Sequence, residues 1–281
     1  MDFASTTILA CSTNADPASP HSLTTEAVVG GVCLAVLAVL LLVRPLRRLG
    51  CFVMYGVCLL LLALLLPAVD AAREAARRSS CGCSLTVIGL ALQNYADVYG
   101  SFPPAYITDG RGNRLHSWRV LILPYLEQKP LYDQYDFSEP WNGPHNRLLV
   151  KYMPAAYRCP SDDVARPGET SYAAIEGPGT LLSESEGSRV ADIKDGTSTT
   201  LAVVEAAGSG INWMEPRDIP FGSLAKGLMS TTKPGMASRH GGACKVVFGD
   251  GHTGALNSTT PAKTLQALAT RAGGERVDDD Y

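Results

Sequence analysis

The sequence predicts an α+β chain in which a long N-terminal helix, membrane-embedded and then continuing as a stalk, packs on an antiparallel β-sheet and is preceded by an extra transmembrane helix. Three observations favour this fold class. An apolar run over residues 51–69 passes without a turn signal into the Ala-, Arg- and Glu-rich residues 70–78. A second apolar run precedes it at residues 27–43, and short β-type runs separated by turn residues follow from residue 169.

Both apolar runs are long enough to cross a bilayer, so residues 27–69 are predicted to form two transmembrane helices joined by a basic loop. The loop carries Arg44, Arg47 and Arg48, whereas residues 1–26 contain no Lys or Arg. The positive-inside rule therefore places the loop in the cytoplasm and the N-terminal segment outside. A cleaved signal peptide is the alternative for the first run, but it would need a basic segment ahead of the apolar one.

The second apolar run is expected to continue as a helix over residues 70–99. Pro67 removes one backbone hydrogen bond, but good helix formers on both sides favour a bend over a stop. Gly100 and the two prolines that follow are typical of a helix end. One apolar stripe recurs at spacings of three and four, which predicts that the sheet domain covers this face: Leu85, Ile88, Leu92, Tyr95 and Tyr99.

The rest of the extracytoplasmic domain, residues 70–281, is predicted in three parts. Residues 100–168 form a loop-rich middle, within which a short helix is expected after Ser117. The sheet spans residues 169–256, with strands near Thr170, Ser198 and Cys244 and Asp-Gly turns at Asp195 and Asp250. Residues 261–281 are a C-terminal helix and tail, with Pro261 at the first turn.

Charge and motifs limit the function classes. A formal net charge of −3 in 281 residues offers no electrostatic footprint for nucleic acid, so no nucleic-acid partner is predicted. The chain lacks a G-x-S-x-G elbow, an H-E-x-x-H helix, a phosphate loop and a dinucleotide fingerprint. We therefore predict a protein that is not an enzyme.

Five blocks in order resemble the DUF1559 family, which has pilin-like and pseudopilin-like N-terminal helices and an H-x9-DG element. They are LLLPAVDAAREAARR, IGLALQNYADVYGSFPPAY, SWRVLILPYLEQKPLYDQY, YRCPSD with DGTSTTLAVVE, and His240 separated by nine residues from Asp250-Gly251. The resemblance covers roughly residues 60–255. It implies a pilin-like architecture more than an activity.

The chain departs from that family at its N-terminus. Members typically carry GFTLIE, cut after the Gly, with a Glu that aligns subunits in a filament. Here Gly50 is followed by Cys51 and Phe52 with no Glu nearby, and a further apolar run precedes it. A permanently anchored relative is therefore favoured over a pseudopilin-type subunit of a secretion or pilus-like assembly.

The resemblance also suggests a disulfide, since Cys81 matches a family cysteine on the helix and Cys159 stands in the family's CPSD turn. An oxidising extracytoplasmic location would permit this bond. Cys83 and Cys244 remain as a weaker second pair. Zinc binding through Cys81 and Cys83 is the rival, but one intervening residue is closer than zinc-site cysteines usually stand.

Six residues of the sheet region are candidates for ligand or metal binding. Their carboxylates suit a divalent cation, their imidazoles a transition metal, and the tryptophan a sugar: Glu205, Trp213, Asp218, His240, Asp250 and His252. The competing interpretation is structural, because Asp-Gly turns often cap themselves. A hydrolase using His240 with Asp250 or Glu205 has little support.

Together these features predict a cell (inner) membrane protein with two spans and an extracytoplasmic domain that has a structural or interaction role in the envelope. The alternatives are an envelope glycan- or metal-binding module and the pseudopilin-type subunit. Predicted partners are the lipid bilayer and other envelope proteins or surface glycans. No cofactor is predicted, and a divalent cation is the alternative.

Overall fold

The computed structural model describes residues 31–32, 34–35, 47–184, 186–228, 235–275 and 277, with the backbone alone at 47–53. The described chain divides between Ala76 and Arg77 into two compact units, and each is considered by itself. Most of the first predicted span, and with it the extra transmembrane helix, lies outside the described residues, as does Arg44.

Helix α3 (Arg47–Tyr99) begins before the second apolar run and continues through Pro67, as expected from the helix formers around it. From Met54 it is the one helix among the described residues long and apolar enough to cross a membrane, and none of its most apolar window is buried. Leu60, Leu64 and Leu66 are each about 60% exposed or more, at 59%, 62% and 67%. Within the part of the chain that the structure describes, this segment therefore presents an uncovered apolar surface.

In the second unit, the last turns of α3 supply a buried stripe. Leu85 and Ile88 are fully buried and Leu92 is 1% exposed, as the spacing predicts. Tyr95 is only half-buried, and Tyr99 is 61% exposed, so the stripe ends earlier than expected. The helix terminates where Gly100 adopts a φ of +75° and donates its N–H to the Ala96 carbonyl.

A five-stranded sheet in the order β5-β3-β4-β6-β7 forms the centre of this unit. The predicted antiparallel sheet is wrong in one respect: β5 runs parallel to β3, so the sheet is mixed. Residues 206–218 form a long connection that returns the chain to the far edge of β3, which a tight hairpin could not do. The strands are β3 (Tyr172–Glu176), β4 (Leu201–Glu205), β5 (Ile219–Pro220), β6 (Ala243–Phe248) and β7 (Thr253–Asn257).

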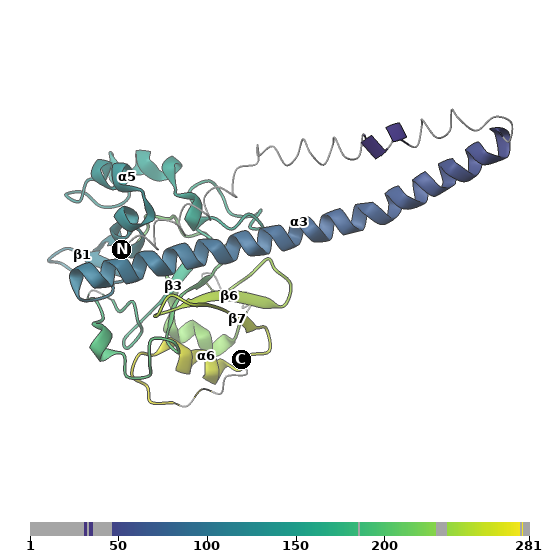
Figure 1. Ribbon diagram of the computed structural model, residues 1–281. Helices are drawn as coiled ribbons and strands as arrows, with labels where there is room; N and C mark the ends of the chain where they lie inside the picture. The colour runs from purple at the N-terminus through teal and green to yellow at the C-terminus, as the bar shows by residue number, and fades with distance from the viewer. Residues whose placement is uncertain are drawn as a thin grey trace. The chain divides into compact units, whose positions relative to one another are not determined.

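Each face of the sheet is covered by a helix, which gives two core clusters. Ala174 and Val247 face α3 with Leu85 and its neighbours, whereas Ala173 and Val246 face α6 (Ala262–Ala269). Figure 1 shows the last turns of α3 and the helix α6 on opposite sides of β3 and β6. The β6–β7 hairpin turns at Gly251, as its Asp-Gly sequence predicts.

The middle of the chain contains more regular structure than predicted. β1 (Tyr106–Thr108) and β2 (Arg114–Ser117) pair as a separate two-stranded sheet. The predicted short helix is α4 (Trp118–Leu121), which Ser117 caps through its side chain. The remaining short elements are α5 (Lys129–Gln134) and the 3₁₀ helices η2 (Leu123–Leu126), η3 (Asn146–Tyr152), η4 (Ala155–Tyr157), η5 (Val190–Asp192) and η6 (Phe221–Lys226).

Candidate functional site

A disulfide joins α3 to the turn that follows η4. Cys81 and Cys159 are bonded across 78 residues, with their Cα atoms 5.2 Å apart. Both are buried, at 0% and 3% exposed, because Cys81 lies at the start of the stripe that the sheet covers. The pairing that the family resemblance suggested is therefore confirmed.

The Cys159–Asp162 turn is held firmly by Asp162. Its Oδ2 accepts hydrogen bonds from the Ser171 hydroxyl at 2.9 Å and the Gly208 N–H at 3.0 Å, while its own N–H donates to the Cys159 carbonyl. Arg158 adds donor bonds to the Asp162 and Ala165 carbonyls. These contacts fix the position of Cys159 independently of its bond to Cys81.

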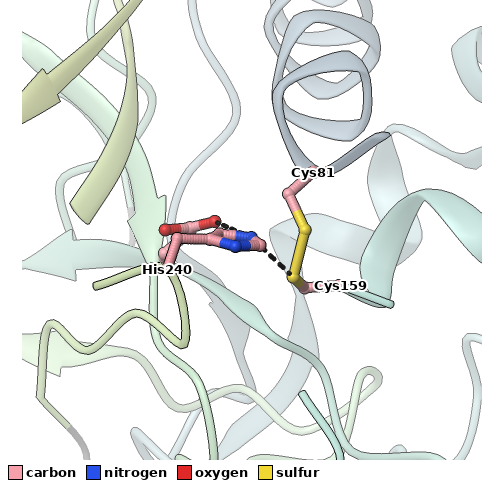
Figure 2. A group of neighbouring side chains, drawn as sticks. Cys81, Cys159 and His240 are labelled. Carbon is pink, nitrogen blue, oxygen red and sulfur yellow. Dashed lines mark hydrogen bonds and ion pairs between the residues drawn. A yellow bond between two sulfur atoms is a disulfide. The ribbon is translucent and has the colours of Figure 1, made fainter. Parts of the chain in front are cut away.

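His240 and Glu205 complete the cluster around the disulfide. The His240 Nε2 atom lies 3.5 Å from Cys159 Sγ and 3.8 Å from Glu205 Oε1. Figure 2 shows the His240 ring directed at the Cys159 end of the disulfide. The two side chains are 4% and 2% exposed, so the site is closed to solvent.

Glu205 ends the central strand β4, and its two carboxyl oxygens differ in their hydrogen bonding. Its Oε2 accepts the Lys245 N–H at 2.9 Å, whereas Oε1 is buried and has no hydrogen-bond partner in the described part of the chain. Burial raises the pKa of this carboxyl, although hydrogen bonds from Lys245 and Ser238 and the nearby His240 act to lower it. An under-satisfied buried carboxylate oxygen is uncommon and points to a role that packing alone does not explain.

Two of the six sequence candidates belong to the core. Trp213 is fully buried, donates its Nε1–H to the Val150 carbonyl at 3.1 Å and stacks on Tyr157. It therefore presents no open face to a sugar. Asp218 is 1% exposed and forms an ion pair with Arg119 at 2.5 Å, so its carboxylate already has a charged partner.

Asp250 and His252 form a separate pair at the β6–β7 turn. Asp250 Oδ1 accepts a hydrogen bond from the backbone N–H of His252 at 3.0 Å. The same oxygen lies 2.6 Å from the His252 ring atom Nδ1. The His252 ring stacks on Phe248 with centroids 4.4 Å apart. This is the self-capped turn of the structural interpretation. Of the six candidates, all of which the structure describes, Glu205 and His240 are the two that lie beside the disulfide. Ligand binding by the other four stays a prediction.

The same turn contacts α3 through glycines. A Cβ atom on Gly89 would lie 2.6 Å from a Val247 methyl and 3.2 Å from the Gly251 backbone. Gln93, one turn further along, donates its side-chain amide to the Gly249 carbonyl. The Asp-Gly end of the H-x9-DG element is thus a docking surface for the helix.

Gly89→Ala is expected to destabilise the domain by about 1–2 kcal/mol, because overpacking against Val247 and Gly251 outweighs the gain in helix propensity. Gly82→Ala on the same helix is the matched control, since its Cβ would meet only the mobile end of Lys245. That variant should be neutral or slightly stabilised. Chemical denaturation of the full chain in detergent, followed by tryptophan fluorescence, would measure both, and equal shifts would contradict the contact.

The second predicted disulfide is wrong. Cys244 is a free, buried thiol, whereas Cys83 takes part in a disulfide of its own. Burial raises the pKa of the Cys244 thiol, which keeps it neutral. The zinc alternative at Cys81 and Cys83 also fails as stated, because both sulfurs are oxidised.

Sequence reasoning missed Arg119 and Gly89. Arg119 is fully buried, and nothing in the pattern around it distinguishes it from an exposed arginine. Gly89 does carry a signal, because a glycine inside an otherwise strong helix commonly marks a close approach.

Comparison with known proteins adds one finding. Residues 70–186 match a family described as "Protein of unknown function (DUF1559)". The match includes α3 beyond the apolar segment and the Cys159 turn, but ends before His240. No curated protein and no solved structure matches the chain.

Proposed function

Because residues 70–186 are a DUF1559 region, we propose that the chain is a membrane-anchored, non-catalytic protein of the cell envelope with a structural or interaction role. Helix α3 supplies the anchor with its apolar segment. Residues 77–281 form the domain that would act outside the membrane.

The single observation that carries the proposal is the uncovered apolar segment of α3. From Met54 to Val69 the helix contains no charged residue, and its leucines are largely exposed. An apolar surface of this length is unfavourable in water. A bilayer satisfies this surface, and the backbone of a continuous helix has its hydrogen bonds made internally.

The disulfide supports an extracytoplasmic domain. Cys81 and Cys159 are bonded, and structural disulfides persist in oxidising compartments outside the cytoplasm. This agrees with the orientation that the Arg44, Arg47 and Arg48 cluster predicts.

The buried cluster supports a role without turnover. His240 and Glu205 are the pair that a hydrolase would use, yet both are more than nine-tenths buried beside a closed disulfide. A substrate approaching from solvent would have no path to Nε2 without opening the domain.

The double variant Leu61→Arg with Leu64→Arg is expected to lose its membrane insertion. After alkaline carbonate extraction it should leave the membrane pellet and appear in the soluble or aggregated fraction. Two arginines near a helix centre cost roughly 5–7 kcal/mol of insertion free energy. Leu148→Arg is the matched control, because Leu148 is 61% exposed on the domain against 62% for Leu64. Retention of the double variant in carbonate-washed membranes would contradict the proposal that this segment of α3 is a membrane anchor.

The pseudopilin-type subunit remains the second candidate, because packing against other copies would also cover the exposed leucines. The intact mass of protein from native membranes separates the two. A mass near 29.8 kDa supports a permanent anchor, whereas a chain starting after Gly50 would indicate processing and make filament partners the next question.

A further inference from the structure

We propose that reduction of the Cys81–Cys159 disulfide converts the buried cluster into a four-ligand site for a thiophilic divalent ion, of which Zn²⁺ is the type. The ligands would be Cys81, Cys159, Glu205 and His240. The inference rests on the geometry of the domain and is independent of the function proposed above.

The ligand atoms already stand at metal-site spacing. The two sulfurs, a Glu205 oxygen and a His240 ring nitrogen all lie within 4.8 Å of one another. Zn–S and Zn–N bonds of about 2.3 and 2.0–2.1 Å place S and N ligands of a tetrahedral ion about 3.5 Å apart. The observed separation of Cys159 Sγ and His240 Nε2 is 3.5 Å.

A second edge of the tetrahedron, between His240 and Glu205, is also close to metal-site spacing. A tetrahedral ion holds N and O ligands about 3.3 Å apart, and His240 Nε2 lies 3.8 Å from Glu205 Oε1. One ring nitrogen therefore faces both a sulfur and a carboxylate oxygen, which is the arrangement of ligands around a shared centre. The two sulfurs move most, from bonded contact to about 3.8 Å when the disulfide opens, and the His240–Glu205 edge shortens by about 0.5 Å.

The carboxylate is prepared for such a role. Glu205 Oε2 is held by the Lys245 N–H, while the oxygen that faces His240, Oε1, is buried and accepts no hydrogen bond from the described residues. A cation at the centre would satisfy this oxygen. A backbone donor to the other oxygen is the usual second-shell partner of a metal-binding carboxylate.

The four ligands come from separate, well-held elements. Cys81 lies on α3, Cys159 on the turn fixed by Asp162, and Glu205 at the end of β4. His240 lies just before β6, where its backbone N–H donates to the Ser238 hydroxyl at 3.1 Å. All four side chains are buried, so the site would be a closed one of the structural kind. A metal would then hold the helix to the sheet while the disulfide is open.

The redox step balances with a dithiol reductant. The dithiol gives two electrons and two protons to the Cys81–Cys159 bond, which becomes two thiols, and the reductant leaves as its own disulfide. Zn²⁺ then binds the two thiolates, the Glu205 carboxylate and the neutral His240 Nε2, and both thiol protons are released to solvent.

The test uses the full chain in detergent, oxidised or reduced, titrated with Zn²⁺ against a chelator of known affinity. We expect the reduced chain to bind one more Zn²⁺ than the oxidised chain and to gain thermal stability from it. Glu205→Gln and His240→Ala should each weaken this binding by more than the 10–100-fold that loss of an outer partner costs.

Control variants separate this site from other thiols that reduction exposes. Cys83→Ser and His252→Ala should keep the additional Zn²⁺, whereas Cys81→Ser and Cys159→Ser should each lose it. Loss of Zn²⁺ binding by Cys81→Ser could also result from a loosened fold. The thermal stability of His240→Ala is therefore measured in the oxidised state, where the disulfide still holds the domain together. Equal binding by oxidised and reduced chains, or unchanged binding by reduced Glu205→Gln and His240→Ala, would overturn the proposal.

Discussion

Replacing both Cys81 and Cys159 by alanine is expected to lower the free energy of unfolding by about 4–5 kcal/mol. The bond closes a loop of 78 residues, and the chain-entropy estimate for a loop of that length is in this range. The variant frees the whole loop-rich middle from α3 in the unfolded chain. Most single domains have only about 5–15 kcal/mol in total, so the loss would approach global unfolding at elevated temperature.

Guanidinium denaturation of the full chain in detergent would measure this loss. All three tryptophans lie in the domain, at Trp118, Trp141 and Trp213, so their fluorescence reports on it alone. Cys244→Ala is the control, because Cys244 is a buried free thiol whose removal leaves every cross-link intact. Should the double variant and the control unfold at the same denaturant concentration, the disulfide would have no stabilising role.

The parts of the fold that depend on local sequence were predictable. The long helix with Pro67 inside it and the end at Gly100 both follow from propensity and turn chemistry. The alternation of β3, with Ala174 toward α3 and Ile175 toward α6, needed only the period of a strand.

The parts that depend on distant contacts were not. The parallel pairing of β5 with β3 comes from the path of the loop over residues 206–218, which has no periodic signal. Trp213 and Asp218 looked functional because residue type shows chemistry but not burial, and both proved to be core residues with internal partners. The Cys81–Cys159 pair could be predicted only through the family resemblance.

The H-x9-DG element contacts α3 at both of its ends. At one end His240 contacts the disulfide beside Cys81, and at the other Gly251 approaches Gly89. Cys81 and Gly89 are separated by about 12 Å along the helix axis, and β6 (Ala243–Phe248) lies between the two ends of the element. The two ends therefore contact two positions on one helix, so the element has a packing role.

Asp218→Asn is expected to destabilise the domain by about 3–5 kcal/mol, because it leaves the Arg119 guanidinium buried without a counter-charge. Asp218 also accepts hydrogen bonds from Trp118 Nε1 at 3.0 Å and the Ala174 N–H at 2.7 Å. Burial raises the pKa of Asp218 to about 6, against the opposing effect of Arg119. The carboxylate is thus charged at neutral pH. Arg119 and the hydrogen bonds to Asp218 offset only part of the free-energy cost of burying this charge.

A double-mutant cycle would distinguish a coupled pair from two independent core residues. Arg119→Met alone should also be strongly destabilising, since it strands the Asp218 charge, whereas Arg119→Met with Asp218→Leu removes both charges together. The double variant should therefore lose about 1–3 kcal/mol less than the sum of the single losses. Arg114→Met with Glu176→Leu is the comparison, because that pair is partly exposed, at 39% and 12%, and should couple more weakly. Additive losses at Arg119 and Asp218 would mean that each is held by its neutral partners, the Tyr172 carbonyl and the Ala174 N–H, and that the ion pair itself contributes little.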